Sequence, residues 1–342
     1  MKVLISGGAG FIGSNAAQRF LAKGDEVVVI DNLSRAGAES NLVWLRYHEQ
    51  LKFLNLDIRD ASRVYKVIAE HRDADLILHL AAQVAVTTSV IDPRTDFEVN
   101  ALGTLNILEA ARITKVDAPI IYSSTNKVYG GVDDVRIIER TERYEYADRP
   151  LGISEQQNLD FHSPYGCSKG AAEQYVRDYH RIYGLNTVVM RQSCIYGPRQ
   201  FGVEDQGWVA WFMIGADSGY PLTIYGDGKQ VRDILFVEDL LDAFEAAAAN
   251  MKTSAGGVFN IGGGPANAIA LMDLINYIQN RQAKGLKYTF GPWRPGDQRV
   301  YVSDIRHARA VLGWEPRVNV KEGLDSLYSW VRENRELLRC AA

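Results

Sequence analysis

The stretch "ISGGAGFIGSN" (residues 5–15) decides the fold, because an apolar run ends there in a cluster of glycines. Gly7, Gly10 and Gly13 have the G-x-x-G-x-x-G spacing between a predicted strand and the start of a predicted helix. Glycines at these positions permit a tight turn and close approach of the backbone to a pyrophosphate, which the helix N-terminus binds through its N–H groups. The motif alone is weak, since glycine-rich turns are common. In this context we expect it to bind a dinucleotide, with Phe11 and Ile12 beside the glycines.

Further apolar runs follow this loop at regular intervals. They are "EVVVID" (26–31), "LKFLNLD" (51–57), "DLILHLAA" (75–82) and "APIIYSS" (118–124). Continuous runs are typical of parallel strands that are covered on both faces. Helix-like stretches alternate with them, which predicts an α/β fold with a doubly wound parallel sheet. We expect a Rossmann domain at 1–190, with segments near 232–262 returning to it. A smaller, interleaved α/β lobe at 191–231 and 263–342 would bind the substrate.

The overall composition excludes several kinds of partner. The chain has 342 residues, 46% of them hydrophobic, and a net charge of −4, so we expect no general binding to nucleic acid or to a membrane. Its three cysteines are widely spaced, which fits a cytoplasmic protein without disulfides. The six histidines are scattered without metal-ligand spacing, so we expect no metal.

Polar and small residues stand at the ends of the predicted strands, where ligands collect in open α/β sheets. A carboxylate at Asp31 accepts hydrogen bonds from ribose hydroxyls and repels a 2′-phosphate, so NAD is favoured over NADP. Arg35 lies nearby and softens that preference, unless it is simply an exposed loop residue. Asp57 and Ile58 are placed to contact adenine. The other predicted cofactor contacts are Asn32, Ser34, Leu80, Ala81, Ala82, Gln83 and Ser123.

A possible reactive group combines a strand end with a helix. Thr125 ends the run at 118–125, and Tyr165 and Lys169 are four positions apart, so they share one face of a helix. We expect Thr125 to lie beside the Tyr165 hydroxyl. An ammonium at Lys169, together with a positive nicotinamide ring, favours the phenolate and makes Tyr165 a base near neutral pH. The plainer alternative is a Tyr and a Lys on the surface of an amphipathic helix.

The motifs together resemble a known family. "GGAGFIGS", "DNLS", "SSTNKVYG", "SPYGCSKGAAEQY", "YGPRQ" and "VRDILFVEDL" are similar in order and spacing to the extended short-chain dehydrogenase/reductases that modify nucleotide sugars. The resemblance covers essentially the whole chain. It implies that Thr125, Tyr165 and Lys169 form the catalytic triad and that Asn100 holds the active-site helix. It also implies a homo-oligomer, either a dimer or a tetramer.

Two residues bear on the type of reaction. The 4,6-dehydratases of this branch follow the threonine with Asp-Glu, whereas this chain has Asn126 and Lys127. An amide is neither an acid nor a base near pH 7, so dehydration is disfavoured and epimerisation through a transient ketone is favoured. The finer resemblance is to the CDP-paratose 2-epimerases, also called CDP-tyvelose epimerases. It implies an enzyme that reversibly inverts C2 of a CDP-linked 3,6-dideoxyhexose with tightly bound NAD.

Two alternatives stay open at this point. The first is an epimerase of a UDP- or GDP-hexose at C4 or C2, because the triad chemistry is the same at either carbon. The second is a non-enzymatic NAD-binding regulator, whose triad would be eroded. The intact triad disfavours the regulator.

The resemblance also implies contacts to the nucleotide sugar. Arg232, Arg294 and Asp297 match positions that bind the diphosphate and nucleoside, although arginines paired with surface carboxylates are an alternative. Further candidates are Gln83, Thr87, Thr125, Asn126 and Arg199. Cys194 stands where the branch often has an asparagine, and a thiol is a poor partner for phosphate. The hydrogen-bond donor that the asparagine would give to the phosphate is therefore either absent or supplied by another residue.

Overall fold

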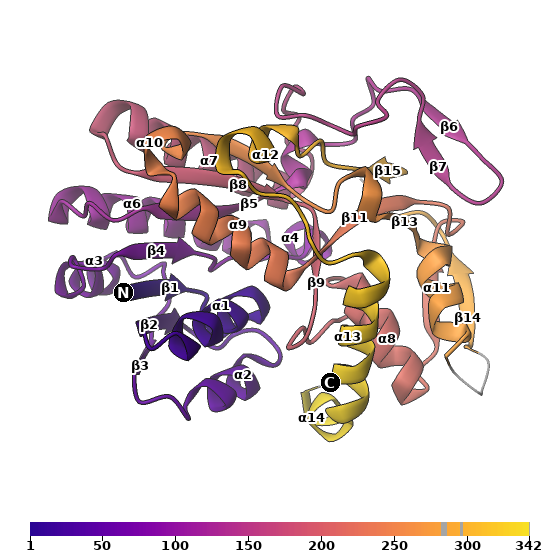
Figure 1. The fold of residues 1–342 in the computed structure, drawn as a ribbon, viewed down its shortest axis with the longest axis horizontal. Coiled ribbons are helices and arrows are strands. Elements are labelled where there is room, and N and C mark those ends of the chain that lie inside the picture. Colours follow the sequence, from indigo (N-terminus) through magenta and orange to yellow (C-terminus); the bar gives the residue numbers. More distant parts are fainter. Residues whose placement is uncertain (282–285, 295–296, 342) are drawn as a thin grey trace.

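The structure, a computed structural model, describes residues 1–281, 286–294 and 297–341. Its centre is a seven-stranded sheet in the order β12-β8-β5-β4-β1-β2-β3, and all its neighbouring pairs are parallel (Figure 1). These strands are β1 (Lys2–Ser6), β2 (Glu26–Asp31), β3 (Leu51–Asn55), β4 (Leu76–His79), β5 (Ile120–Thr125), β8 (Thr187–Gln192) and β12 (Val258–Ile261). Helices cover both faces, so the predicted doubly wound sheet is confirmed.

The two faces of the sheet bury separate apolar cores, which explains why its strands are continuously hydrophobic. On one face the strands pack against α3 (Ala61–Glu70), α6 (Gly103–Thr114) and α7 (Ser163–Tyr183). On the other face they pack against α1 (Phe11–Ala22), α9 (Val237–Ala249) and α12 (Arg306–Leu312). Neighbouring β1 residues alternate between the cores, since Leu4 belongs to the first and Ile5 to the second. Every strand end therefore has a fixed position at one edge of the sheet.

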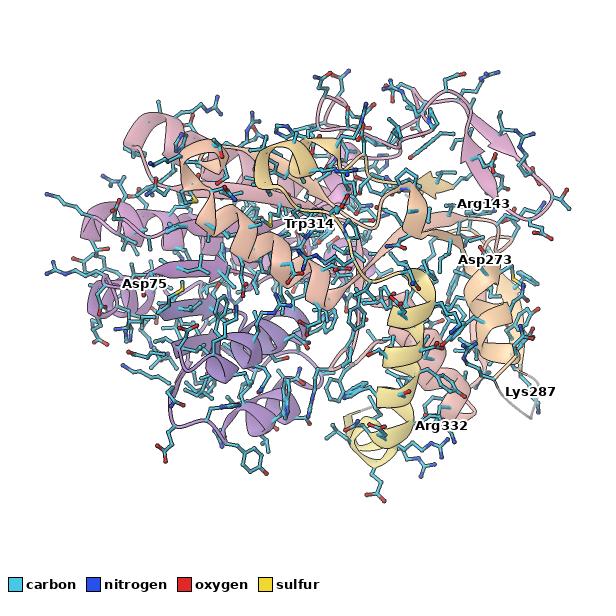
Figure 2. All side chains as sticks on the ribbon, viewed as in Figure 1. Asp75, Arg143, Asp273, Lys287, Trp314 and Arg332 are labelled. Atoms are coloured by element: carbon cyan, nitrogen blue, oxygen red, sulfur yellow. The ribbon has the colours of Figure 1, made fainter. Side chains whose placement is uncertain are left out.

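Late segments of the chain return to this sheet. β12 pairs with β8 at the edge, and α9 contacts α1. The Trp314 indole, labelled in Figure 2, donates a hydrogen bond to the Asp239 carbonyl of α9 at 2.8 Å. The division of the chain into a domain at 1–190 and a lobe at 191–231 and 263–342 stays a prediction.

A second group of elements lies beyond the carboxyl edge of the sheet (Figure 1). Its strands are β9 (Cys194–Tyr196), β10 (Leu222–Tyr225), β11 (Val231–Phe236), β13 (Ala268–Ala270), β14 (Tyr288–Gly291) and β15 (Val300–Tyr301). Its helices are α8 (Trp208–Ser218), α11 (Leu271–Gln279), α13 (Val320–Glu333) and α14 (Arg335–Ala341). The stretch Gly226-Asp227-Gly228 is typical of a hairpin turn, but the strands on either side of it, β10 and β11, do not pair with each other. β10 pairs with β14, while β11 pairs with β9, β13 and β15, because each strand finds its apolar partners elsewhere.

Shorter elements complete the chain. They are α2 (Ala38–Leu45), α4 (Val86–Ile91), α5 (Pro93–Phe97), the π-helix η1 (Glu98–Leu102), the 3-10 helix η2 (Asn126–Tyr129), β6 (Ile137–Glu139), β7 (Tyr144–Tyr146), α10 (Met251–Ser254) and η3 (Pro265–Asn267). In the described part of the chain, no helix combines the length and the apolar character needed to span a membrane.

Candidate active site

The glycine-rich loop joins β1 to α1 and leaves no room for side chains at two positions. Gly7 has φ +74°, and a Cβ there would lie 2.6 Å from the Ala81 nitrogen at the end of β4. A Cβ on Gly13 would lie 2.1 Å from the Gly7 carbonyl oxygen. The first turn of α1 can therefore pack closely against the loop only because both residues are glycines. This cradle at a helix N-terminus fits a pyrophosphate.

Asp31, at the end of β2, is fixed by the backbone. Its two carboxylate oxygens accept hydrogen bonds from Ala9 N at 3.0 Å and from Leu33 N at 2.8 Å. Burial raises its pKa, and these hydrogen bonds oppose the shift. Each oxygen keeps a lone pair for a further donor, so the carboxylate fits a ribose diol beside the glycine loop.

The adenine end of the predicted site is less buried. Asn32 Nδ2 donates to Asp57 Oδ2 at 3.0 Å. Asp57 also forms an ion pair with Arg59 at 2.8 Å, and this pair lowers its pKa to about 2. Asp57 is therefore a carboxylate at every physiological pH, with both oxygens engaged by the Arg59 guanidinium and Oδ2 also by Asn32.

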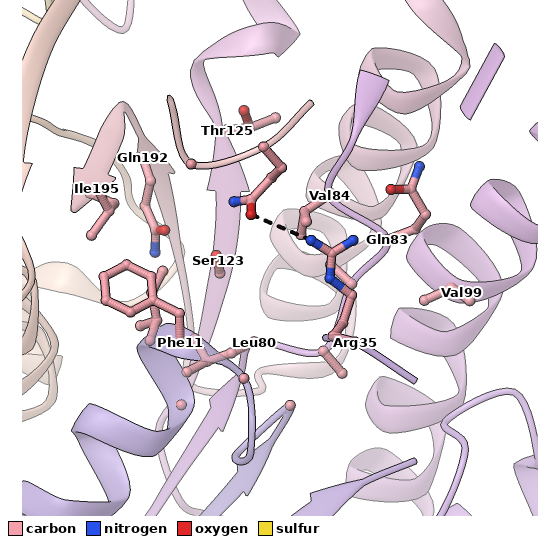
Figure 3. Close-up of a pocket in the computed structure, with 18 of the residues that line it drawn as sticks. Phe11, Arg35, Leu80, Gln83, Val84, Val99, Ser123, Thr125, Gln192 and Ile195 are labelled. Atoms are coloured by element: carbon pink, nitrogen blue, oxygen red, sulfur yellow. Dashed lines mark hydrogen bonds between the residues drawn. The ribbon is translucent and has the colours of Figure 1, made fainter. Parts of the chain in front are cut away.

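The strand ends enclose a cleft of about 500 Å³. Its walls include all the predicted cofactor residues except Asn100, namely Gly7, Gly10, Phe11, Ile12, Gly13, Asp31, Asn32, Ser34, Arg35, Asp57, Ile58, Leu80, Ala81, Ala82, Gln83, Ser123, Tyr165 and Lys169. Figure 3 shows Arg35 extending into the cleft, where its Nη2 donates to Gln206 Oε1 at 3.4 Å. Arg35 therefore reaches from the β2 side of the cleft to the loop that precedes α8.

Asn100 lies behind the cleft and holds one of its walls. Its side chain accepts a hydrogen bond from Gln83 N at 2.9 Å and donates to Gln83 O at 3.0 Å. It also donates to Ser168 Oγ of α7 at 3.0 Å and to Asp96 Oδ1 at 3.1 Å. Asp96 is completely buried and accepts hydrogen bonds from Gln83 Nε2 and Ser168 Oγ as well. Asp96 was not predictable from the sequence, because nothing in a helical stretch distinguishes a buried carboxylate from an exposed one.

The predicted reactive residues converge at the end of β5. Tyr165 and Lys169 lie on α7 and are almost fully buried, and they line the cleft together with Thr125. Lys169 Nζ donates to the Ser123 carbonyl at 2.5 Å and lies 4.4 Å from the centre of the Tyr122 ring. Thr125 Oγ1 accepts a hydrogen bond from Lys127 N at 3.2 Å, and this contact orients its hydroxyl. The strand end and the helix thus present a phenol, a hydroxyl and an amine to one space.

Burial dominates the ionisation of this group in the protein alone. It raises the pKa of Tyr165 to about 12, opposed by a hydrogen bond with Thr125 and, more weakly, by the positive charge of Arg35. Burial also lowers the pKa of Lys169 to about 7, although Asp96 and Glu173 oppose the shift. The phenol is therefore protonated near neutral pH without a further positive charge beside it, and the predicted phenolate, which depends on the nicotinamide ring as well as on Lys169, stays a prediction.

A second cavity of about 240 Å³ adjoins the cleft. Of the predicted substrate residues, Thr87, Arg232, Arg294 and Asp297 line this second cavity, whereas Gln83, Thr125, Asn126 and Arg199 line the cleft. Trp208 and Trp211 of α8 form part of the second cavity's wall. Several residues line both cavities and mark their junction, namely Val86, Lys127, Cys194, Asp205, Gln206, Gly207 and Trp208.

The predicted arginines have different partners. Arg232 is buried, and its Nη2 donates to Asp297 Oδ1 at 2.6 Å and to the Gln298 carbonyl at 2.6 Å. The Arg294 guanidinium lies 3.9 Å from the centre of the Tyr225 ring and pairs with Asp205 at 3.4 Å. Arg199 stacks instead on Trp44, 4.2 Å from the ring centre, so it is separate from the other two.

Metal chemistry has no visible basis in this region. Within residues 1–281, 286–294 and 297–341, no three His, Cys, Asp or Glu side chains are arranged to hold a metal ion. The expectation of a metal-free site stays a prediction.

Known proteins share this fold and this site region. A sequence profile of the family described as GDP-mannose 4,6 dehydratase matches residues 4–327. A CDP-paratose 2-epimerase from Salmonella typhi is 47% identical over 335 residues, which is 96% of this chain and 99% of that protein. The structure of a Thermus thermophilus UDP-glucose 4-epimerase in complex with NAD matches with a TM-score of 0.80 and 34% identity, over 97% of this chain and 99% of the other. That of a Streptomyces venezuelae dTDP-glucose 4,6-dehydratase with NAD bound matches with a TM-score of 0.85 and 29% identity, over the full length of both chains.

The profile match covers nearly the whole chain, and so does the match to the Salmonella epimerase. The resemblance inferred from the motifs is therefore confirmed. The chain belongs to the GDP-mannose 4,6 dehydratase family of extended short-chain dehydrogenase/reductases, which includes nucleotide-sugar epimerases and dehydratases.

Proposed function

We propose that this chain is an NAD-dependent epimerase that reversibly inverts C2 of a CDP-linked 3,6-dideoxyhexose, converting CDP-paratose to CDP-tyvelose. The observation that carries the proposal is the end of β5. There Thr125 lies with Tyr165 and Lys169 at the cleft, and the next two residues are Asn126 and Lys127 instead of carboxylates. The 47% identity to a CDP-paratose 2-epimerase supports the choice of substrate.

The glycine cradle, Asp31 and the ends of β4 and β5 would hold the dinucleotide. When bound, NAD⁺ supplies a hydride acceptor and the positive charge that the Tyr165 phenol lacks in the protein alone. Tyr165 removes the proton of the C2 hydroxyl and later returns it, while Thr125 orients that hydroxyl. Lys169 is held by the Ser123 carbonyl and fixes the geometry beside the phenol.

Inversion requires that the ketone formed at C2 presents its other face before it is reduced. The hexose must therefore be held loosely, while the nucleotide is held firmly. Arg232 and Asp297 form a rigid pair in the second cavity, which suits firm binding of the nucleotide end. Trp208 and Trp211 offer apolar surface that suits a deoxygenated sugar.

The test uses purified protein, CDP-paratose and D₂O without added cofactor, followed by NMR. We expect conversion to the 2-epimer without deuterium at C2, since the same hydrogen leaves and returns. Deuterium at C2 would mean enolisation and would contradict the proposal. Inertness toward CDP sugars with turnover of UDP sugars would favour a UDP-hexose epimerase, the activity named for the Thermus thermophilus protein.

We also propose that the chain forms a homo-oligomer, with two copies pairing through α6 and α7. These helices contact each other and carry large apolar side chains that are about half exposed or more: Ile113, Tyr175, Ile182 and Tyr183. Such side chains on adjacent helices are typical of a protein interface. Sedimentation of an Ile182→Glu variant is expected to show dissociation into monomers. An unchanged mass would contradict this interface. The cytoplasmic location and the absence of nucleic-acid or membrane partners stay predictions.

A further inference from the structure

The junction of the two cavities is bordered by an ammonium group that has no hydrogen-bond acceptor among the residues that the structure describes. Lys127 follows Thr125 by two residues and lines both the cleft and the second cavity. Its side chain is about three-quarters buried, and its Nζ lies 4.0 Å from Asp297 Oδ1. In the described part of the chain, this Nζ donates no hydrogen bond, and Asp297 is its nearest carboxylate.

Lys127 shares its nearest carboxylate with a second cation. Asp297 lies between Lys127 and Arg232, and the shorter contact, at 2.6 Å, belongs to Arg232. The two other carboxylates of the second cavity contact different residues, since Asp205 pairs with Arg294 and Glu204 accepts a hydrogen bond from Tyr225. Among the described residues, the Lys127 ammonium therefore has no carboxylate within hydrogen-bond distance. A largely buried charge of this kind is unfavourable unless a ligand neutralises it.

The thiol at the junction does not supply this anion. Burial raises the pKa of Cys194, and the positive charges of Arg232 and Lys127 only partly oppose the shift. The thiol is therefore uncharged near neutral pH, and it is a weak hydrogen-bond donor. A phosphate placed here would find its strong donors in Lys127 and Arg232.

The position of Lys127 indicates which of the two phosphates of the nucleotide sugar it would bind. The reacting sugar has to lie beside Thr125 and Tyr165 in the cleft, and the nucleoside then occupies the second cavity. The phosphates therefore cross the junction. Arg232 lines only the second cavity, whereas Lys127 lines both and lies nearest Thr125. Lys127 is thus the cation closest to the phosphate that carries the hexose.

We propose that the Lys127 ammonium binds the β-phosphate of the nucleotide sugar and, with Arg232, forms the fixed point about which the hexose turns. This inference rests on the proposed function for the orientation of the substrate. It assigns to Lys127 the donor that Cys194 cannot provide.

The experiment compares CDP with CMP, which differ by the β-phosphate, in calorimetric titrations of the NAD-loaded protein. Lys127→Met is expected to weaken CDP binding by about tenfold or more, because a charge-assisted hydrogen bond to a phosphate is lost. CMP binding is expected to change by less than twofold. Lys127→Arg keeps the charge and is expected to retain most of the CDP affinity.

Lys229→Met is the matched control, since Lys229 pairs with Glu139 outside both cavities. It is expected to bind CDP and CMP as the unmodified protein does. Equal losses of CDP and CMP affinity in Lys127→Met, or no loss of either, would overturn the inference. If the protein prefers uridine nucleotides, the same comparison with UDP and UMP tests the role of Lys127. That preference would contradict the choice of a CDP sugar in the proposed function, but not the role of Lys127.

Discussion

The dinucleotide cleft is built from the ends of consecutive strands, whereas the second cavity is built from side chains far apart in the sequence. In the cleft the key groups are backbone groups and short side chains, such as the Gly7–Gly13 loop and Asp31, which is held by Ala9 N and Leu33 N. In the second cavity the key group is an ion pair between Arg232 and Asp297. The geometry of the cleft is determined by local sequence and by the sheet. The geometry of the second cavity is determined only by the complete tertiary structure.

This difference has a functional counterpart. A cofactor that is reused in each cycle suits a cleft whose shape depends on glycines and on the rigid edge of the sheet. A sugar that must turn suits a cavity that holds the nucleotide at one end by side chains and leaves the hexose with few partners. The predicted reactive residues line the cleft, at the end of β5 and on α7.

The largest expected effect comes from a residue of the cleft, Tyr165. Tyr165→Phe removes the hydroxyl that exchanges a proton with the sugar in the proposed mechanism, and we expect turnover to fall by about 10³-fold or more. NAD and CDP affinities should change by less than threefold, since phenylalanine keeps the ring in place. Turnover by NMR and binding by calorimetry measure the two quantities separately. Full activity in this variant would remove Tyr165 from the proton-transfer role.

A substitution in the glycine loop should affect binding in the cleft without affecting binding in the second cavity. In Gly13→Val, a Cβ would lie 2.1 Å from the Gly7 carbonyl oxygen, so the loop must move away from the pyrophosphate position. We expect NAD affinity to fall by about 100-fold, or about 2.7 kcal/mol, while CDP affinity changes by less than twofold. Gly24→Ala is the control, because a Cβ at Gly24, just after α1, has no neighbour within 4 Å, although Gly24 has φ +84° and Gly13 is helical. A parallel loss of NAD and CDP affinity would show that the two regions are coupled.

The converse substitution is Arg232→Met. It removes a buried guanidinium beside Asp297, and we expect CDP affinity to fall by about 10- to 100-fold with unchanged NAD affinity. Arg306→Met is the matched control, since Arg306 also pairs with an aspartate but is mostly exposed and lines neither cavity. Melting curves of both variants check that the fold persists. If CDP binds equally well to Arg232→Met, this arginine has only a structural role.

The same contrast explains what could be predicted from the sequence. The order of strands and helices in the first half follows from continuous apolar runs and a glycine motif, so the main sheet and the cleft residues at its edge were predictable. The pairing of β10 with β14 was not, because the Gly226-Asp227-Gly228 turn carries the local signal of a hairpin while the strands pair with distant segments.

Buried polar contacts were the least predictable part of the site. Asp96 acts through Gln83, Asn100 and Ser168, and these contacts arise only when α5, η1 and α7 pack together. Lys127 was noticed in the sequence as a poor acid or base. Its position at the junction depends on Asp297, which is 170 residues away in the chain. No periodicity or motif links such residues.

A smaller effect should appear in the pH dependence of stability. The pKa of Lys169 is lowered to about 7, so between pH 7 and about 10 the unfolded chain binds more protons than the folded chain. The free energy of unfolding should therefore rise with pH in this window, by up to ~1.4 kcal/mol per pH unit from this group. Urea denaturation at pH 7, 8 and 9 measures the rise. Lys169→Met should make the free energy of unfolding nearly independent of pH in this window. An unchanged slope in that variant would show that Lys169 is not the group whose pKa is lowered.

The smallest effect is expected at Arg35, which reaches across the cleft from the β2 side. Its bond to Gln206 is long, at 3.4 Å, and its side chain is exposed, so its loss should cost little. We expect Arg35→Ala to weaken NAD binding by about two- to fivefold. NADP binding should weaken equally, because the guanidinium is directed toward Gln206 and Tyr165 and not toward the ribose position at Asp31. Titration of both dinucleotides tests this, and a selective loss of NADP affinity would show that Arg35 contacts the 2′-phosphate. In that event one wall of the cleft would depend on a charged side chain, as the second cavity does through Arg232.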